Sequence, residues 1–442
     1  MNKTRLICLL LCLAMVLSVF GCKAQPAETA AQPESTAEAV ASEATPEVAA
    51  EPQIPEKPEK LTILSVNNAT GLWDYVAEWE AQTGIKVEIT EMDLPTLQTQ
   101  ATTYFAAKSS DIDLVYTYVA LTAEWANAGY LCDIRDYLTA DEWAGFSQGA
   151  LNCVTYKDNI YGLPYFYSIR LFYSNMDLLK AAGYTEPPKT WDEFFEIAKA
   201  CTDASKDQYG VLMGLATNDN CCLSYQDICA LYGQTLVSSD DQILFNNEKG
   251  VAALEKFVAL KNSGALDPAS YGVASGNERR ARFLTGKVAM AWEWASLMPM
   301  IEKQGTFEGK LSLTPAIEIS GAITGSEGLA VSEFSANKYW AVDLLKYLTS
   351  DDVQSRYAKT SGWFPVKTAV FDDPAVLGLS SAMAAAKEQA QNPTFRWAAP
   401  YYSEAITALG THLFAALDGT ETPTDALNMA GTEVQTIIDS YK

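Results

Sequence analysis

The chain of 442 residues has little of the chemistry that many enzymes and nucleic-acid-binding proteins use. It contains one histidine, His412, and no Gly-x-Ser-x-Gly motif, so a Ser-His or Cys-His mechanism would depend on this one side chain. Lys and Arg number 31 against 55 Asp and Glu, a net charge of −24. This shortage of cations argues against nucleic acid and disfavours highly anionic ligands. Since no such motif accompanies His412, we expect it to be a structural or surface residue, in an amphipathic helix over residues 405–417.

The cysteines show no metal-binding pattern. No Cys-x-x-Cys pair occurs among the nine, and Cys221, Cys222 and Cys229 lack the spacing of a zinc ribbon, so we predict no metal site. In an exported chain the cysteines outside the N-terminal region could form disulfides or remain as buried thiols, and the sequence leaves both open. These are Cys132, Cys153, Cys201, Cys221, Cys222 and Cys229.

Long apolar runs are also scarce, apart from one that extends from Leu6 to Leu17. Lys3 and Arg5 precede it, and it is too short for a typical membrane span, so residues 1–21 are predicted to be a signal peptide. It ends in a small residue followed by Cys22, which resembles a lipoprotein processing box. We therefore expect Cys22 to carry lipid and become the mature N-terminus. Ordinary secretion with cleavage nearby is the alternative.

Residues 22–60 are rich in Ala, Glu and Pro and contain almost no large apolar side chain. Such a segment cannot bury enough surface to offset the entropy lost on ordering, so we predict a disordered tether. A flexible chain of this length has an end-to-end distance of roughly 35 Å. The folded body should begin near Leu61 and is long enough for two domains.

The body opens with the order strand, helix and strand. Residues 61–66 are β-rich, residues 73–82 have apolar positions at helical spacing, and residues 85–89 alternate as a second strand. Such an order predicts a βαβ unit in a mostly parallel sheet. A second informative stretch, residues 171–201, begins with an aromatic strand. Two helices should follow, one capped by Asn175 and one opened by a Thr190–Glu193 capping box.

The motifs of residues 171–201 occur in an unusual order: aromatic strand, Asn-x-Asp-Leu-Leu, Ala-Gly-Tyr and Pro-Pro-Lys-Thr-Trp-Asp-Glu-Phe. That order resembles the family 1 extracellular solute-binding proteins, the substrate-capturing subunits of ABC importers. Similar family motifs recur along the body: Glu-x-Gln-Thr-Gly-Ile-x-Val at 80–87, Tyr-Gly-Leu-Pro at 161–164, Phe-Leu-x-Gly-Lys-x-Ala-Met at 283–290 and Ser-Gly-x-x-Pro-Val at 361–366.

The resemblance implies an α/β, two-lobed periplasmic-binding-protein-like fold of type II. Each lobe should be a mostly parallel sheet flanked by helices, and a hinge of several chain crossings should join the lobes. Lobe 1 is predicted to comprise residues 61–166 and 313–352. Lobe 2 is predicted to comprise residues 167–312 and 353–442, with the C-terminal helices.

A ligand cleft is expected between the lobes. Ligands of open parallel sheets sit beyond the carboxyl ends of strands, which selects the polar residues that follow the strand at 61–66 and a further predicted strand at 113–116. The resemblance adds the first lobe crossing, the turn after residues 283–290, the turn at 361–366 and a loop near residue 395. Together these predict ligand contacts at Asn67, Asn68, Thr117, Tyr118, Tyr165, Tyr167, Trp292, Glu293, Trp294, Trp363 and Trp397.

The resemblance further implies a carbohydrate ligand, either mono- or oligosaccharide, with Trp294 or Trp292 stacked on the sugar. The protein would bind without catalysis or a cofactor, as a lipid-anchored monomer on the outer face of the bacterial cytoplasmic membrane, and deliver its ligand to the permease subunits of an ABC importer. The alternatives are a polyol ligand, Fe(III) held by the adjacent Tyr401 and Tyr402, or an exported glycoside hydrolase with two facing carboxylates.

Overall fold

The computed structural model describes residues 54–66, 71–230, 232–238, 240–272, 275–295, 297–304, 311–314, 322–391 and 393–442. The predicted signal peptide, the lipid site at Cys22, most of the tether, and the predicted ligand residues Asn67 and Asn68 lie outside these ranges. None of the described helices is both long enough and apolar enough to cross a membrane.

The first sheet has five strands in the order β2-β1-β3-β12-β6. Strand β1 pairs in parallel with β2 and β3, as predicted, whereas β12 returns from far along the chain and runs antiparallel to β3 and β6. This sheet is therefore mixed rather than mostly parallel. Its strands are β1 (Lys60–Val66), β2 (Lys86–Met92), β3 (Leu114–Tyr118), β6 (Gly162–Phe166) and β12 (Glu327–Val331).

The predicted helix between β1 and β2 is α2 (Trp73–Thr83), which ends at Gly84 in the left-handed conformation, with φ of 79°. Trp79 of α2 is buried and donates a hydrogen bond of 2.9 Å from Nε1 to Asp343 Oδ2 of α14 (Lys338–Leu348). Trp340 Nε1 of α14 donates to the carbonyl of Glu56 over 3.0 Å, so the backbone just before β1 also contacts this helix. The remaining helices of residues 94–151 are α3 (Leu94–Ala106), α4 (Val119–Asn127), α5 (Ala140–Ala144) and α6 (Gln148–Leu151).

The second sheet has four strands in the order β10-β7-β9-β8. Strand β7 is antiparallel to β9 and β10, and only β8 and β9 are parallel, so this sheet is mixed as well. The prediction of mostly parallel sheets fails here because the chain returns through long connections that reverse its direction. The strands are β7 (Arg170–Asn175), β8 (Tyr209–Leu212), β9 (Val288–Trp294) and β10 (Leu311–Thr314).

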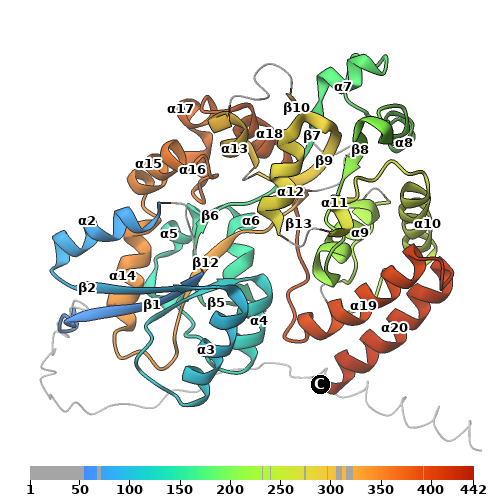
Figure 1. Cartoon of the computed structure of the whole chain (residues 1–442). Helices are drawn as coiled ribbons and strands as arrows, with labels where there is room; N and C mark the ends of the chain where they lie inside the picture. The colour runs from blue at the N-terminus through green and yellow to red at the C-terminus, as the bar shows by residue number, and fades with distance from the viewer. Residues whose placement is uncertain are drawn as a thin grey trace, which may run out of the picture. The chain divides into compact units, whose positions relative to one another are not determined.

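Both helices predicted after β7 are present with their caps. The side chain of Asn175 accepts hydrogen bonds from two backbone N–H groups at the start of α7 (Met176–Ala181). Thr190 and Glu193 form the predicted capping box of α8 (Trp191–Ala200), whose buried face covers the second sheet. The other helices packed in this core are α9 (Asn218–Ala230), α10 (Glu248–Asn262), α19 (Tyr402–Leu417) and α20 (Pro423–Ser440). Figure 1 shows these helices grouped on one side of the molecule and the first sheet on the other.

Residues 351–391 form a group of shorter helices that begins with α15 (Asp351–Ser361). Gln354 of α15 is fully buried and donates to the carbonyl of Tyr165 in β6 over 3.2 Å, so this group contacts the first sheet directly. The lobe boundaries given above stay a prediction. The shorter elements are α11 (Ala269–Gly272), α12 (Gly276–Arg282), α13 (Leu297–Gln304), α16 (Thr368–Asp372), α17 (Pro374–Leu377), α18 (Ser381–Gln389), β4 (Thr155–Tyr156), β5 (Asn159–Ile160), β11 (Ala322–Ile323) and β13 (Pro393–Thr394).

Two adjacent connections leave the first sheet, one to the second sheet and one to the two-stranded sheet of β11 and β13. Residues 167–169 lead from β6 to β7, and residues 324–326 lead from β11 to β12. They run side by side, since Gly325 donates its N–H to the carbonyl of Ser168 over 2.9 Å and Ile169 forms a bridge with Thr324. The paired crossings bring the ends of β9 and β12 to the same region of the molecule.

Candidate functional site

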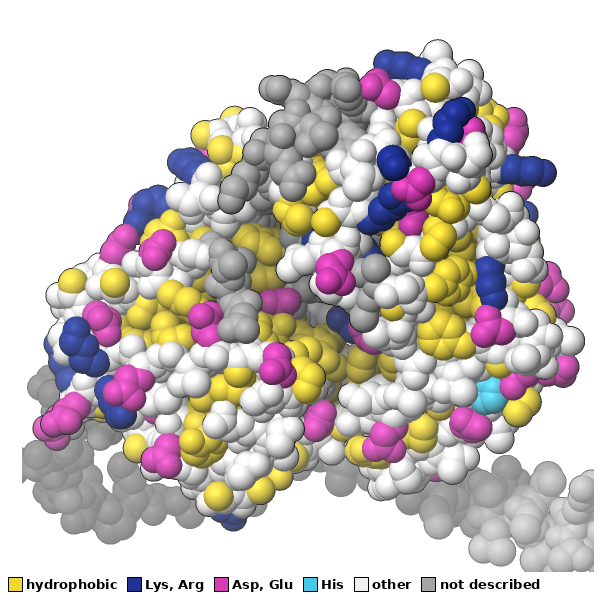
Figure 2. Space-filling model, viewed as in Figure 1, with side chains coloured by type: hydrophobic (Ala, Val, Ile, Leu, Met, Phe, Trp, Pro, Cys, Tyr) yellow, Lys and Arg dark blue, Asp and Glu magenta, His cyan; other side chains and the backbone are white. Residues whose placement is uncertain are grey.

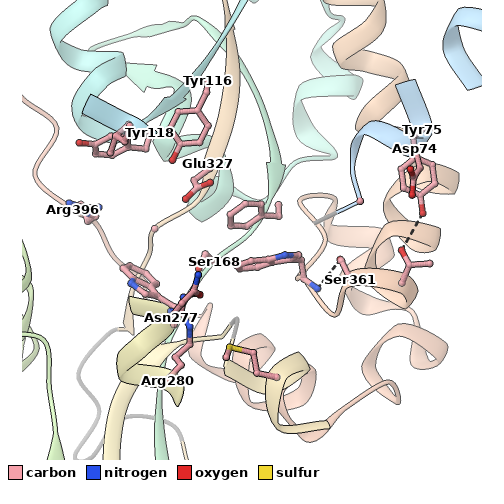
Figure 3. Close-up of a pocket in the computed structure, with 18 of the residues that line it drawn as sticks. Asp74, Tyr75, Tyr116, Tyr118, Ser168, Asn277, Arg280, Glu327, Ser361 and Arg396 are labelled. Carbon is pink, nitrogen blue, oxygen red and sulfur yellow. Dashed lines mark hydrogen bonds between the residues drawn. The ribbon is translucent and has the colours of Figure 1, made fainter. Parts of the chain in front are cut away.

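A cavity of about 840 Å³ opens between the first sheet and the part of the body that contains the second sheet. Its described lining residues come from β3, β6, β9, β12, α2, α3, α9, α12, α13, α15, the connections at residues 168 and 325, and the loop before α19. The surface is hollowed in the middle of the view in Figure 2. In Figure 3, Tyr116, Tyr118 and Glu327 lie on one side of this cleft and Asn277 and Arg280 on the opposite side. A site of this size and position is typical for a small-molecule ligand.

The first sheet contributes the end of β3 and the start of β12. Because these strands are antiparallel neighbours, Tyr118 lies opposite Glu327 in the sheet register. Tyr165 donates its hydroxyl hydrogen to Glu327 Oε2 over 3.3 Å. Burial raises the pKa of Glu327 to about 7, although hydrogen bonds from Tyr116 and Tyr165 and the charge of Arg396 oppose the shift. The cleft therefore contains a carboxyl group that titrates near neutrality.

Trp294, at the end of β9, is the principal aromatic side chain from the second sheet. Its indole rests against the crossing at Gly325, and the Arg170 guanidinium lies 5.5 Å from the ring centroid. Arg170 is itself buried and ion-paired with Asp227 over 2.8 Å. Burial raises the pKa of Asp227 to about 6 against the opposing charge of Arg170. The indole thus lies against the backbone of Gly325 and near the buried Arg170–Asp227 ion pair.

A second indole lines the cleft from the other side. Trp363 follows Gly362, which ends α15 in the left-handed conformation with φ of 74°. The rings of Trp363 and Phe166 stack with centroids 4.1 Å apart. The two aromatic surfaces, Trp294 and Trp363, therefore belong to different parts of the chain.

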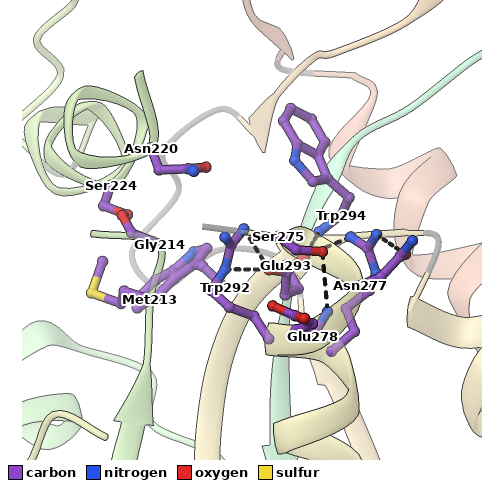
Figure 4. Close-up of polar contacts among 12 residues, drawn as sticks. Met213, Gly214, Asn220, Ser224, Ser275, Asn277, Glu278, Trp292, Glu293 and Trp294 are labelled. Atoms are coloured by element: carbon purple, nitrogen blue, oxygen red, sulfur yellow. Dashed lines mark hydrogen bonds and ion pairs between the residues drawn. The ribbon is translucent and has the colours of Figure 1, made fainter. Parts of the chain in front are cut away.

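Arg280 and Asn277 of α12 line the cleft (Figure 3). Figure 4 shows Asn277 in the same cluster as Glu293 and Trp294. Arg280 donates to Glu293 Oε2 over 3.1 Å and to Asn277 Oδ1 over 2.7 Å. Glu293 also accepts the backbone N–H of Trp294 over 3.1 Å and is ion-paired with Arg279 over 3.2 Å. The Glu293 carboxylate thus orients its neighbours, and Arg280 and Asn277 are the polar side chains of this cluster that line the cleft.

Arg396 lines one end of the cleft. Its Nη2 donates to Asp219 Oδ1 over 2.8 Å and to the Tyr402 hydroxyl over 2.6 Å, and that hydroxyl donates to the same Asp219 oxygen over 2.6 Å. The guanidinium carbon lies 5.5 Å from the ring centroid of Tyr118. Arg396 therefore joins the loop before α19 to α9 and to the end of β3.

Three of the predicted ligand residues line this cleft: Tyr118, Trp294 and Trp363. Thr117 is buried and bonded to Thr122 over 2.7 Å. Trp292 is buried against Trp191, with ring planes 3° apart and centroids 5.0 Å apart. None of the other described predicted residues lines the cleft. Tyr165 lies behind Glu327, Tyr167 is buried in the core, Glu293 supports Arg280, and Trp397 lines a second cavity.

Several polar residues of the cleft were missed by sequence reasoning. They lie near the start of a helix, at the start of β12, or in a loop, where charged residues are ordinary surface features. Only Arg396 had a signal, since it lies within the loop that resembles a ligand-side segment. The missed residues are Asp219, Asn277, Arg280, Glu327 and Arg396.

A two-lobed body with a polar and aromatic cleft at its chain crossings is the type II periplasmic-binding-protein fold. The chain belongs to the family described as bacterial extracellular solute-binding protein, whose model matches residues 74–387. It is thus a member of a class of solute-binding proteins, and several of its curated relatives are named as binding proteins.

Curated relatives include a probable ABC transporter-binding protein of Deinococcus radiodurans, 26% identical over 61% of this chain and 66% of that protein. The diacetylchitobiose binding protein of Streptomyces coelicolor is 27% identical over 80% of this chain and 83% of that protein. The lactose-binding protein of Rhizobium radiobacter is 26% identical over 55% of this chain and 57% of that protein. The chain thus spans about two thirds of the Deinococcus relative.

Solved structures show the same fold. A maltose-bound T. maritima protein superposes with a TM-score of 0.75 at 24% identity, covering 86% of this chain and 99% of that one. A solute-binding protein of Agrobacterium radiobacter in complex with ribitol superposes with a TM-score of 0.76 at 23% identity, covering 87% of this chain and 100% of that one.

Proposed function

We propose that this protein captures a carbohydrate in the cleft and delivers it to an ABC importer. The observation that carries this proposal is the pairing of two indoles, Trp294 and Trp363, with a ring of hydrogen-bonding side chains in one cavity. A sugar has apolar C–H faces and a rim of hydroxyl groups. Aromatic rings can cover the faces while carboxylate, amide and guanidinium groups bond to the rim.

In this proposal, Glu327 and Asp219 accept hydrogen bonds from ligand hydroxyls, and Arg280 and Asn277 interact with ligand hydroxyl groups from the opposite side. Trp294 stacks on one sugar ring, held in place by its contacts with Gly325 and Arg170. The relatives named for diacetylchitobiose and lactose support a saccharide ligand. The ribitol complex of a structural neighbour makes a polyol the second candidate.

The protein acts by binding alone. His412 lies in α19, outside the cleft lining, where its Nδ1 is bonded to Glu421 over 2.9 Å. The iron alternative gains no support from Tyr402, because burial raises the pKa of its hydroxyl well above the usual value. The adjacent Arg396 cation would also repel a metal ion there.

Ligand capture closes the two parts of the body around the paired crossings. Such closure requires a ligand that favours the closed state, since equal affinity for both states shifts nothing. The importer could then distinguish loaded from empty protein. Solution scattering with saturating ligand should give a smaller radius of gyration than without it, and an unchanged radius would refute closure.

The protein is proposed to function as a monomer held at the outer face of the cytoplasmic membrane by lipid on Cys22. A single acyl chain binds membranes only marginally, so multiple acylation of the lipoprotein type is expected. Mass spectrometry of the mature N-terminal peptide tests the anchor. An unmodified peptide that starts elsewhere would refute it.

The decisive experiment is a binding screen over mono-, di- and oligosaccharides and polyols, read by thermal shift and confirmed by titration calorimetry. Ligand at 100 times its dissociation constant stabilises the folded state by about 2.7 kcal/mol, which is readily detected. Incubating each binder with protein and analysing the mixture for hydrolysis tests the glycosidase alternative. Failure of every saccharide and polyol to bind would refute the proposed function.

A further inference from the structure

A second cavity, of about 850 Å³, lies beyond the Arg396 end of the cleft. A small cavity of about 10 Å³ shares Tyr118 and Gly325 with the cleft and Asn152 with the second cavity. Arg396 lines all three of these cavities. A volume of 10 Å³ is about the least that can hold one water molecule, so no sugar unit passes this point in the structure. Arg396 therefore lies at the boundary between the cleft and the second cavity, and we call it the wall.

The Arg396 side chain is held in place by several polar contacts. The Arg396 side chain is only 11% exposed, and its guanidinium is fixed by the charged Asp219 carboxylate and the Tyr402 hydroxyl. Charge-assisted hydrogen bonds of this kind are among the stronger polar contacts in proteins. The rings of Tyr118 and Tyr402 also lie 5.5 and 5.4 Å from the guanidinium carbon. A ligand therefore meets a pre-organised surface here rather than a mobile side chain.

The second cavity has the chemistry of the cleft. Its lining combines aromatic rings with amide and carboxyl groups, supplied by both parts of the body. Tyr156 lies in β4 and Asn152 directly follows α6. Gln226 lies in α9, and Trp397 lies in the loop before α19. Rings beside planar polar groups suit the faces and hydroxyl rim of a sugar. Among the described lining residues, Arg396 is the one that the cleft and this cavity share.

Figure 3 shows the cleft extended between Arg396 at one end and Asp74 and Tyr75 at the other. An extended cleft suits a linear ligand, and a closed end limits its length. Building on the carbohydrate function proposed above, we propose that Arg396 selects ligands by length, because the terminal unit of a linear oligosaccharide abuts its guanidinium. The second cavity is then a set of unused sugar subsites beyond this wall.

Replacing Arg396 with a smaller residue should open the cleft to longer ligands. The probes are mono- to heptasaccharide ladders of α-1,4-glucan, β-1,4-glucan and β-1,4-linked N-acetylglucosamine, titrated by calorimetry into wild-type protein and Arg396→Ala. With wild-type protein, affinity should rise with length and then stop rising at a particular ladder member. With Arg396→Ala, affinity should continue to rise by at least tenfold for longer members. The same length limit in both proteins would overturn the proposal.

Two further variants make the result specific. Arg282→Ala removes another partly buried arginine with two carboxylate partners, Asp207 and Asp267, away from all three cavities, and should keep the wild-type limit. Tyr156→Ala added to Arg396→Ala should abolish the gain for longer members, because Tyr156 lines the second cavity. A gain that survives this addition counts against the second cavity as the site of the extra units.

Folding of the main variant is expected, because the Asp219 side chain is 45% exposed and retains water when its partner is removed. Arg396→Gln, which keeps a donor beside Asp219, provides a milder second test and should shift the length limit in the same direction. If no ladder member binds the wild-type protein, the carbohydrate function itself is refuted. If ladders bind with identical limits in all variants, only the role of Arg396 is refuted.

Discussion

The indole of Trp294 lies directly on the backbone of Gly325. A Cβ atom at residue 325 would come within 2.4 Å of two ring atoms, Cζ3 and Cη2. Real Cβ atoms essentially never approach so closely, so any other residue would move the ring. The aromatic surface of the cleft is thus in contact with one of the two paired connections that leave the first sheet.

Gly325→Ala should therefore weaken saccharide binding by displacing the Trp294 ring. We expect an affinity loss approaching that of Trp294→Ala, measured by calorimetry. Gly272→Ala is a matched control, since a Cβ there meets no atom within 4 Å. In the double variant Gly325→Ala with Trp294→Phe, the smaller ring leaves room for the methyl group. That variant should bind as well as Trp294→Phe alone, whereas additive losses would contradict the contact.

Trp294→Ala should lower the affinity for the bound sugar by about 1–3 kcal/mol, the scale of burying one large apolar side chain. The thermal midpoint of the ligand-free protein should move little, because this indole already faces the cleft. Trp363→Ala should also weaken binding, with an additional loss of stability from the Phe166 stack. Full affinity in both variants would remove aromatic stacking from the proposal.

Glu327 should give the folded protein a distinct pH dependence. Its pKa is raised from 4.5 to about 7, mainly by burial, so the folded state binds a proton more tightly than the unfolded chain does. The resulting stabilisation is present below about pH 4.5 and is lost as the pH rises to about 7. Each pKa unit corresponds to about 1.4 kcal/mol, so the free energy of unfolding should fall on the order of 3 kcal/mol across this window.

The measurement is urea unfolding of wild-type protein and Glu327→Gln between pH 4.5 and 8. Gln keeps an acceptor for the Tyr165 hydroxyl and cannot titrate. The difference in unfolding free energy between the two proteins should change with pH in the stated direction. A difference that is constant over the range would show that Glu327 has an ordinary pKa.

His412 should affect stability but not binding. Burial lowers its pKa, but Glu421 and Glu433 more than offset this effect, so the pKa lies above 6.5. Its contribution to stability is therefore fully present below pH 6.5 and is lost as the pH rises through the folded-state pKa. His412→Ala should lower the thermal midpoint more at pH 6 than at pH 9 and leave saccharide affinity unchanged. Loss of binding in a folded variant would place His412 in the site.

Much of the fold follows from local patterns in the sequence. The capping box of Thr190 and Glu193 and the cap at Asn175 depend only on residues close in sequence, and the structure confirms both. The direction of the strands is harder to predict from the sequence, because β12 joins the first sheet from more than 150 residues beyond β6. Nothing local to residues 327–331 specifies an antiparallel partner.

Local sequence patterns also predict only some of the residues that line the cleft. Trp292 and Trp294 are two residues apart on β9 and equally aromatic, yet Trp292 packs on Trp191 of α8 while Trp294 reaches the cleft. That difference depends on where α8 covers the strand, which no local pattern encodes. Arg396 and Asp219 likewise resemble ordinary surface charges until the fold brings together segments 177 residues apart.

The six cysteines of the described body have a practical consequence for measuring ligand capture. All are unpaired and buried, and burial raises the thiol pKa of Cys132 and Cys201 to about 11 and that of Cys229 to about 12. Such thiols are poorly ionised and inaccessible, so they resist alkylating reagents. A single cysteine introduced at the rim of the cleft, in protein lacking Cys22, would therefore take a fluorescent dye selectively. The native thiols would need no replacement, and the labelled protein would report its own ligand as a sensor.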